Sequence, residues 1–105
     1  MKTTQYLLVC LMEEAAEIQQ AAAKCLRFGL DNYHPEKPEE TNSAALDREL
    51  ADLDAVRYML VGKGVLPYPI LLNQEPLRNK ISKVTRFMEV SKMCGTLEQE
   101  AADED

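Results

Sequence analysis

Hydrophobic positions in the first quarter of the chain recur at alternating spacings of three and four residues. They are Leu8, Leu11, Ala15, Ile18, Ala22 and Cys25. This spacing places them on one face of an α-helix, which we expect to span about residues 4–28. Thr3 or Thr4 is suited to cap the start of this helix, and Gly29 is suited to end it in a left-handed conformation.

A second helical stripe consists of Leu46, Leu50, Leu53 and Leu60. We expect this helix to begin with Asn42 or Ser43 as its N-cap residue. Its end is expected near Val61, because Gly62 and Gly64 follow directly. The preceding segment, residues 30–42, contains two prolines and shows no apolar period, so it is predicted to be a loop. Long ordered loops often act as lids or binding loops, and a plain connector is the alternative.

A third stripe, formed by Leu77, Ile81, Val84 and Met88, predicts a helix over about residues 74–93. Gly95 is expected to stop this helix. No segment of useful length shows the apolar and polar alternation that is typical of a strand. The predicted fold class is therefore all-α, with three main helices in the chain.

The charge of the chain lies mainly at its C-terminal end. The net charge is -6, and five of the 18 acidic residues lie within residues 98–105. We expect residues 1–97 to form one helical domain and residues 98–105 to be a disordered acidic tail. The remainder is nearly neutral, with 13 acidic and 12 basic residues. It lacks the basic footprint of a nucleic-acid-binding protein, and we expect no nucleic acid as partner.

The location predicted for the chain is cytoplasmic. Cys10, Cys25 and Cys94 form no C-x-x-C motif and are interpreted as reduced thiols. No apolar run approaches the roughly 20 residues of a membrane span, so no membrane contact is expected. The apolar stretch at residues 6–12 is too short for a secretion signal and runs directly into two glutamates.

Acidic residues are the candidates for chemistry. Glu13, Glu14 and Glu17 form an E-E-x-x-E pattern on the first helix, where an acidic cluster is usually a solvated face. Glu49 and Asp52 form an E-x-x-D pair on the second helix, and Glu49 falls in the middle of its apolar arc. A carboxylate there is unfavourable unless a cation compensates it. Either a Lys or Arg from another helix or a bound metal ion would do so.

A metal site would need the two helices to pack antiparallel, with their acidic residues at one level. Glu14, Glu17, Glu49 and Asp52 would then converge, and like charges so close require cations. Ligands that are all oxygen suit Mg²⁺, with Mn²⁺ as a possible substitute. The only histidine, His34, lies in the loop, so the Glu-x-x-His pairs of a di-iron bundle are lacking.

The third helix carries a basic side that consists of Asn79, Lys80, Lys83 and Arg86. This side is either an ordinary solvated face or a clamp for phosphate oxygens. Mg²⁺ commonly binds through a few carboxylates together with substrate phosphates, and Lys or Arg then contacts the remaining phosphate oxygens. No Gly-rich phosphate loop of the Walker type occurs in the chain.

The paired acidic motifs in this helical context resemble the MazG-like, all-α nucleoside triphosphate pyrophosphohydrolases. Dimeric dUTPases, dCTP pyrophosphatases and phosphoribosyl-ATP pyrophosphatases belong to the same superfamily. Further similar segments are K-C-L-R-F-G at 24–29, E-L-A-D-L-D at 49–54 and N-K-I-S-K-V-T-R at 79–86. The resemblance covers roughly residues 4–95.

This resemblance implies a reaction, namely Mg²⁺-dependent hydrolysis of a nucleoside triphosphate between its α and β phosphates. The products are the monophosphate and pyrophosphate. The implied metal ligands are Glu14, Glu17, Glu49 and Asp52. Glu13 would orient or deprotonate the attacking water, or hold a metal-bound water. The implied triphosphate contacts are Lys83 and Arg86, with Lys80 and Asn79.

The resemblance also implies assembly into homodimers or dimers of dimers, whose subunits together complete a four-helix core. Residues that recognise the base are not transferable, and the candidates near the first helix are Tyr6, Lys24, Phe28 and Tyr33. Two alternatives stay open. One keeps the fold and metals but acts on a specialised substrate, such as phosphoribosyl-ATP or a non-standard nucleotide. The other is a non-catalytic helical interaction or regulatory dimer.

Overall fold

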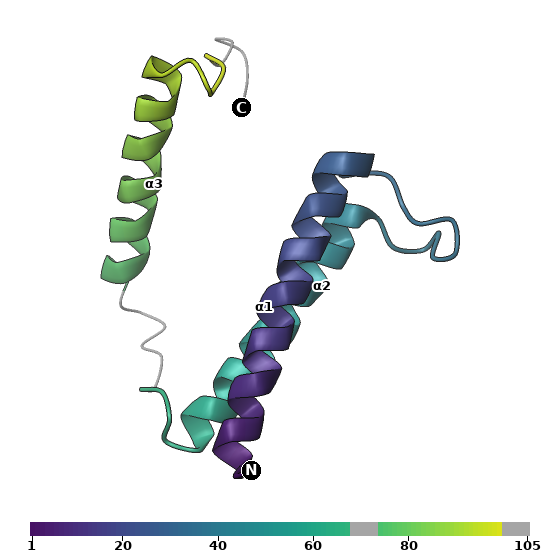
Figure 1. Ribbon diagram of the computed structural model, residues 1–105, viewed down its shortest axis with the longest axis vertical. Coiled ribbons are helices and arrows are strands. Elements are labelled where there is room, and N and C mark those ends of the chain that lie inside the picture. The colour runs from purple at the N-terminus through teal and green to yellow at the C-terminus, as the bar shows by residue number, and fades with distance from the viewer. Residues whose placement is uncertain (68–73, 100–105) are drawn as a thin grey trace. The chain divides into compact units, whose positions relative to one another are not determined.

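The computed structural model describes residues 1–67 and 74–99 and contains three α-helices (Figure 1). They are α1 (Thr3–Phe28), α2 (Asn42–Gly62) and α3 (Glu75–Met93). Within the described residues the only β-type pairing is an isolated antiparallel bridge between Tyr33 and Thr41. The predicted all-α fold is therefore confirmed. The chain divides into two compact units, Met1–Pro69 and Ile70–Asp105, so α1 and α2 belong to one unit and α3 to the other.

Helix α1 ends at Phe28 as predicted, whereas its N-cap residue differs from the predicted one. Lys2, and not Thr3 or Thr4, is the N-cap residue, and its backbone N–H donates to Oε1 of Gln5 at 2.7 Å. At the other end the N–H of Gly29 donates to the carbonyl oxygen of Cys25. Gly29 has the expected positive φ of 95°, but its ψ of 147° is extended. Gly29 thus ends the helix with the left-handed φ that was predicted, and its extended ψ leads the chain into the loop.

Thr41 is the N-cap residue of α2, one position before the predicted cap. Its Oγ1 accepts a hydrogen bond from the N–H of Ala44 at 3.2 Å. Asn42 instead uses its side chain for tertiary contact, since its Nδ2 donates to the carbonyl oxygen of Gly29 at 2.8 Å. The helix includes Gly62 and so ends one residue beyond the predicted end. The side chain of Asn42 is therefore engaged with Gly29, the residue that follows α1, and does not cap α2.

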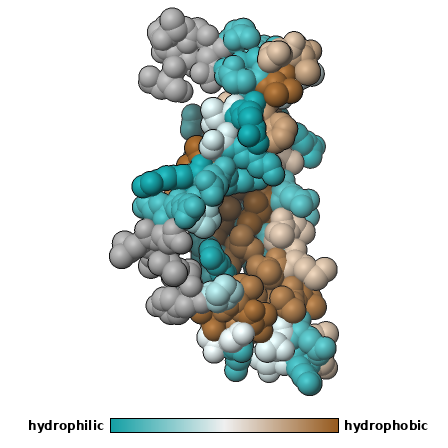
Figure 2. Space-filling view, turned by 90° about the vertical axis from the view of Figure 1, so that its left-hand side faces the viewer, coloured by the Kyte–Doolittle hydropathy of each residue, from teal (hydrophilic) through white to brown (hydrophobic). Residues whose placement is uncertain are grey.

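The two helices of the first unit run antiparallel and lie side by side (Figure 1). Among the described residues the buried apolar side chains are Leu7, Ala21 and Leu60, of which only Leu60 is fully buried. Exposed apolar side chains on these helices include Tyr6, Met12, Leu26, Tyr58 and Met59. Figure 2 shows such hydrophobic side chains, in brown, at the surface of the molecule. The pair of helices thus leaves much apolar surface uncovered, as expected for so small a core.

The loop between α1 and α2 is ordered by backbone hydrogen bonds to the start of α2. The N–H of Asn42 donates to the carbonyl of Asn32 at 2.7 Å, and that of Ser43 donates to the carbonyl of Leu30 at 3.0 Å. At the tip, the N–H of Lys37 donates to the carbonyl of His34 at 2.8 Å. These bonds close the loop on itself, and its side chains therefore take definite positions beside α1 and α2.

The second unit contains α3, which begins one residue later than predicted and ends where predicted. Gly95 follows it with φ of 78°, as expected for a residue that stops a helix. Residues 100–105 of the predicted acidic tail lie outside the described residues. The thiols of Cys10, Cys25 and Cys94 are free, and Cys10 and Cys25 are half-buried whereas Cys94 is exposed. In the part of the chain that the structure describes, no helix is long and apolar enough to span a bilayer.

Candidate metal centre and the adjoining cavity

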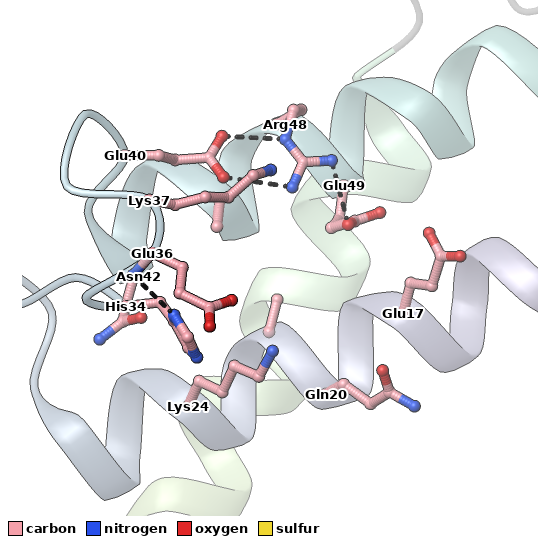
Figure 3. A pocket seen from close by; sticks show the side chains of 12 residues that line it. Glu17, Gln20, Lys24, His34, Glu36, Lys37, Glu40, Asn42, Arg48 and Glu49 are labelled. Atoms are coloured by element: carbon pink, nitrogen blue, oxygen red, sulfur yellow. Dashed lines mark hydrogen bonds and ion pairs between the residues drawn. The ribbon is translucent and has the colours of Figure 1, made fainter.

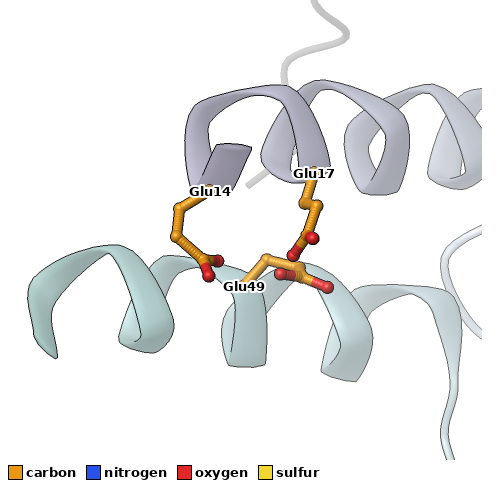
Figure 4. Close-up of side chains that lie close together, drawn as sticks. All are labelled: Glu14, Glu17 and Glu49. Carbon is orange, nitrogen blue, oxygen red and sulfur yellow. The ribbon is translucent and has the colours of Figure 1, made fainter. Parts of the chain in front are cut away.

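Three carboxylates from the two acidic motifs meet between α1 and α2 (Figure 4). Glu14 and Glu17 lie one turn apart on α1, and Glu49 faces them from α2. One carboxylate oxygen of each lies within 4.8 Å of those of the other two. We call these three residues the acidic cluster. Antiparallel packing of the two helices brings the motifs to one level, as the metal-site hypothesis required.

The acidic cluster contains buried oxygens without partners. Oε2 of Glu14 and Oε2 of Glu49 are both buried, and neither has a hydrogen-bond partner within the described structure. The side chain of Glu49 is only 12% exposed. An unpaired buried carboxylate oxygen is strongly unfavourable. The donor set is all oxygen, which fits Mg²⁺ or Mn²⁺, and a cation at this place would compensate both oxygens.

The closeness of these carboxylates changes the titration of Glu17. A protonated Glu17 can donate a hydrogen bond to Glu49, and this bond is the largest cause that raises the pKa of Glu17. The negative charges of Glu14 and Glu49 raise the same pKa further. Glu17 is exposed, so solvent can deliver the proton. Without a cation, the acidic cluster therefore favours uptake of a proton.

Arg48 is the cation that Glu49 contacts, and it comes from the same helix rather than from another one. Its Nη1 lies 3.1 Å from Oε1 of Glu49 and 3.6 Å from Oδ2 of Asp52. Its Nε and Nη2 donate to the two carboxylate oxygens of Glu40, at 2.9 and 3.3 Å. This pairing lowers the pKa of Glu40 and raises that of Arg48. Arg48 thus compensates one oxygen of Glu49 and leaves the other unpaired.

Two of the predicted acidic residues lie outside the acidic cluster. Asp52 is not among the three converging carboxylates, and its side chain is 48% exposed beside Arg48. It is still near enough for its charge to raise the pKa of Glu17, as the smallest of the causes. Glu13 is exposed on α1. The structure therefore brings together three of the four predicted metal ligands.

A cavity of about 690 Å³ adjoins the acidic cluster and shares Glu17 and Glu49 with it (Figure 3). We call it the cationic cavity after Lys24 of α1, Lys37 of the loop and Arg48 of α2, which line it together with Glu36 and Glu40. Lys24 was predicted as a substrate contact, and the structure places it in this wall. Arg48 is already paired with Glu40 and Glu49, so Lys24 and Lys37 are the lining cations suited to contact an anionic ligand.

Sequence reasoning missed Arg48, Glu40 and Lys37. Arg48 had a local signal, since it precedes Glu49 and lies four residues before Asp52 on the same helix. Glu40 and Lys37 had none, because only the closure of the loop brings them to α2 and to the cationic cavity (Figure 3). Side chains of the loop thus form part of the cavity wall.

The predicted phosphate-binding residues of α3 belong to the second unit. Asn79, Lys80, Lys83 and Arg86 are all exposed on that helix. The guanidinium carbon of Arg86 lies 5.7 Å from the ring centroid of Phe87. Their contact with a triphosphate stays a prediction.

Comparison of the chain with protein-family models, curated proteins and solved structures finds no match. The resemblance to the MazG-like proteins therefore rests on the two acidic motifs and the similar helical segments alone. The structure adds an observation that is independent of this resemblance. Residues of both motifs converge beside a cation-lined cavity within a single two-helix unit.

Proposed function

We propose that the protein is a Mg²⁺-dependent nucleoside triphosphate pyrophosphohydrolase. It would cleave a ribo- or deoxyribonucleoside triphosphate between the α and β phosphates, to the monophosphate and pyrophosphate. The observation that carries the proposal is the pair of buried, unpartnered oxygens of Glu14 and Glu49 beside the cationic cavity. Such oxygens favour a bound cation, and Lys24 and Lys37 in the cavity wall are suited to contact the negative charges of a ligand.

Glu14, Glu17 and Glu49 would hold the metal, with Asp52 as the further ligand that the motif implies. A bound Mg²⁺ supplies two effects, since it lowers the pKa of a water ligand and neutralises charge on phosphate oxygens. Metal and proton compete for the same oxygens of Glu17, whose pKa is raised by Glu49 and Glu14. We therefore expect metal binding to weaken as the pH falls through this pKa.

The basic residues would bind and orient the substrate. In the first unit, Lys24 and Lys37 line the cavity and are suited to contact phosphate oxygens. In the second unit, Lys83 and Arg86, with Lys80 and Asn79, are proposed to contact the triphosphate. Positioning and charge stabilisation supply most of the acceleration in phosphoryl-group chemistry. Glu13 is proposed to orient or deprotonate the attacking water.

We also propose that the active form is a homodimer or a dimer of dimers. The first unit buries only three of its described apolar side chains and leaves others on α1 and α2 exposed. Pairing with a second chain would cover such surface and complete a four-helix core. Sedimentation of the purified chain tests this, and a monomer at micromolar concentration would contradict it.

A non-catalytic helical interaction module is the second candidate. The ion pair between Arg48 and Glu49 favours it, because a carboxylate that is already paired has less need of a metal ion. A specialised substrate, such as phosphoribosyl-ATP or a non-standard nucleotide, is a variant of the first proposal. The interaction module and the specialised substrate predict different results when nucleotide hydrolysis is assayed.

The decisive experiment incubates the purified protein with each ribo- and deoxyribonucleoside triphosphate, with Mg²⁺ and with EDTA, and identifies the products. Monophosphate and pyrophosphate, formed only with metal, are the expected result. Diphosphate and orthophosphate would contradict the proposed cleavage. If no triphosphate or phosphoribosyl-ATP is turned over and Mg²⁺ does not raise the melting temperature, the interaction module is favoured.

A further inference from the structure

We propose that a second cavity, at the C-terminal end of α1, binds a nucleobase; this inference rests on the proposed function and names its base-binding residues. The cavity has a volume of about 730 Å³, within the range of small-molecule sites. We call it the aromatic cavity. The residues that line it include Arg27, Phe28, Asn32, Tyr33, His34 and Asn42.

The aromatic cavity presents rings suited to stacking. Phe28 and Tyr33 are 52% and 53% exposed, although both lie in the cavity wall. The guanidinium carbon of Arg27 lies 4.8 Å from the ring centroid of Phe28, which adds a planar cation to the same wall. Bases stack on half-exposed aromatic rings and on guanidinium groups, and this stacking does not depend on which base is present.

The same wall carries groups that can hydrogen-bond to the edge of a base. Nδ2 of Asn32 donates to the carbonyl of Phe28, and Nδ2 of Asn42 donates to the carbonyl of Gly29. Each carboxamide is thereby held in place, and its oxygen accepts no hydrogen bond within the described structure. Nδ1 of His34 accepts from the N–H of Glu36 at 3.1 Å. Its Nε2 therefore carries the proton of the neutral ring and is a donor.

The position of the aromatic cavity favours a nucleotide over other flat aromatic ligands. It shares Lys24, His34 and Asn42 with the cationic cavity, so the two cavities adjoin. Phe28 lies 11 residues beyond Glu17 on the same helix, which is about 16 Å along its axis. A ligand that reached from one cavity into the other would therefore carry its charged groups near the acidic cluster and its planar group about this far away. An extended nucleoside triphosphate carries its base at one end and its phosphates at the other.

The test uses nucleosides as probes, because they lack phosphate and do not depend on the metal site. The eight common ribo- and deoxyribonucleosides are titrated into the metal-free protein, and the side-chain amide signals of Asn32 and Asn42 are followed by NMR. We expect at least one nucleoside to shift both signals. In Phe28→Leu or Tyr33→Leu its dissociation constant should rise about fivefold or more, since a stacking ring is lost.

The matched control is Leu26→Ala. Leu26 is 90% exposed on the same helix and lines neither cavity, so nucleoside affinity should be unchanged. Circular dichroism shows whether each variant is folded. The inference is overturned if no nucleoside shifts the two amide signals, or if Phe28→Leu and Tyr33→Leu both bind as the wild type does.

Failure of this inference is distinguishable from failure of the proposed function. Nucleosides that bind in the expected way without hydrolysis of any triphosphate would contradict the function and support the cavity assignment. Hydrolysis with an unchanged KM in Phe28→Leu and Tyr33→Leu would contradict the cavity assignment alone. Inorganic triphosphate with Mg²⁺ serves as the second probe, because its affinity should not depend on Phe28.

Discussion

Nη1 of Arg48 lies 3.1 Å from Oε1 of Glu49, its neighbour on α2, while Oε2 of the same carboxylate is buried without a partner. One oxygen is therefore compensated by a protein cation and the other is not. The Arg48 side chain is 45% exposed and also reaches Glu40, so it can move without opening the core. Under the proposed function, Oε2 of Glu49 is the oxygen that would bind the metal ion.

Glu49→Gln should abolish turnover without unfolding the protein. A metal ion supplies several kcal/mol of transition-state stabilisation, so losing a ligand should lower kcat more than about a hundredfold. Removing a buried, half-compensated charge should leave stability in EDTA equal or higher. Initial rates and urea unfolding measure the two effects. Asp54→Asn, an exposed acid on the same helix, is the control, and near-normal rates in Glu49→Gln would refute the site.

Arg48→Gln should make Mg²⁺ more stabilising. The substitution removes the cation that contacts Glu49 and Asp52 in the metal-free protein. Because Arg48 is nearly half exposed, the loss of stability in EDTA should be about 1 kcal/mol or less. The rise in melting temperature with Mg²⁺ should exceed that of the wild type, since metal and guanidinium no longer compete. Arg57→Gln on the same helix is the control, and an equal rise in both variants would contradict this competition.

The stability of the metal-free protein should fall as the pH rises above about 4.5 through the raised pKa of Glu17. Glu49 and Glu14 raise this pKa from its ordinary value of 4.5, so the folded state binds the proton more tightly than the unfolded state. The resulting stabilisation is fully present below 4.5 and is lost as the pH passes the folded pKa. Urea midpoints measured against pH in EDTA should show this fall in the wild type but not in Glu17→Gln. The same fall in both proteins would count against the coupling.

Gly29→Ala should destabilise the protein, because φ of 95° is unfavourable for a residue with a side chain and the added Cβ would lie 3.0 Å from Nδ2 of Asn32. We expect a loss of about 1–3 kcal/mol in the free energy of unfolding. Gly62→Ala is the matched variant, since no atom lies within 4 Å of its added Cβ. At the last residue of α2 it should stabilise by less than about 1 kcal/mol. Urea unfolding of both variants measures the contrast, and equal effects would refute the strained turn.

Lys83→Ala and Arg86→Ala should each weaken binding of a nucleoside triphosphate by roughly tenfold or more, because a charge-assisted hydrogen bond contributes about 1.5–3 kcal/mol. The measurement is KM in the pyrophosphate-release assay. Lys92→Ala is the control, since Lys92 pairs with Glu89 on the same helix. An unchanged KM in both test variants would show that the second unit takes no part in phosphate binding.

The positions of the three helices were predictable, because each is set by local periodicity and by nearby glycines or prolines. The caps were predicted less well. Thr3 and Asn42 are good cap residues in isolation, yet Lys2 and Thr41 are the caps observed. The side chain of Asn42 bonds to Gly29 instead. This contact joins residues 13 positions apart in the sequence, so the cap preferences of single residues do not predict it.

By itself, the sequence determined the all-α class, the helix bounds to within a residue or two and the placement of Glu49 on an apolar arc. Each follows from spacing along one chain segment. Only the tertiary structure decided which carboxylates meet, because convergence depends on the register between α1 and α2. It placed Glu14, Glu17 and Glu49 together and left Asp52 beside Arg48. It also brought Glu40 and Lys37 to the cationic cavity, because loop closure joins residues whose local sequence carries no signal of contact.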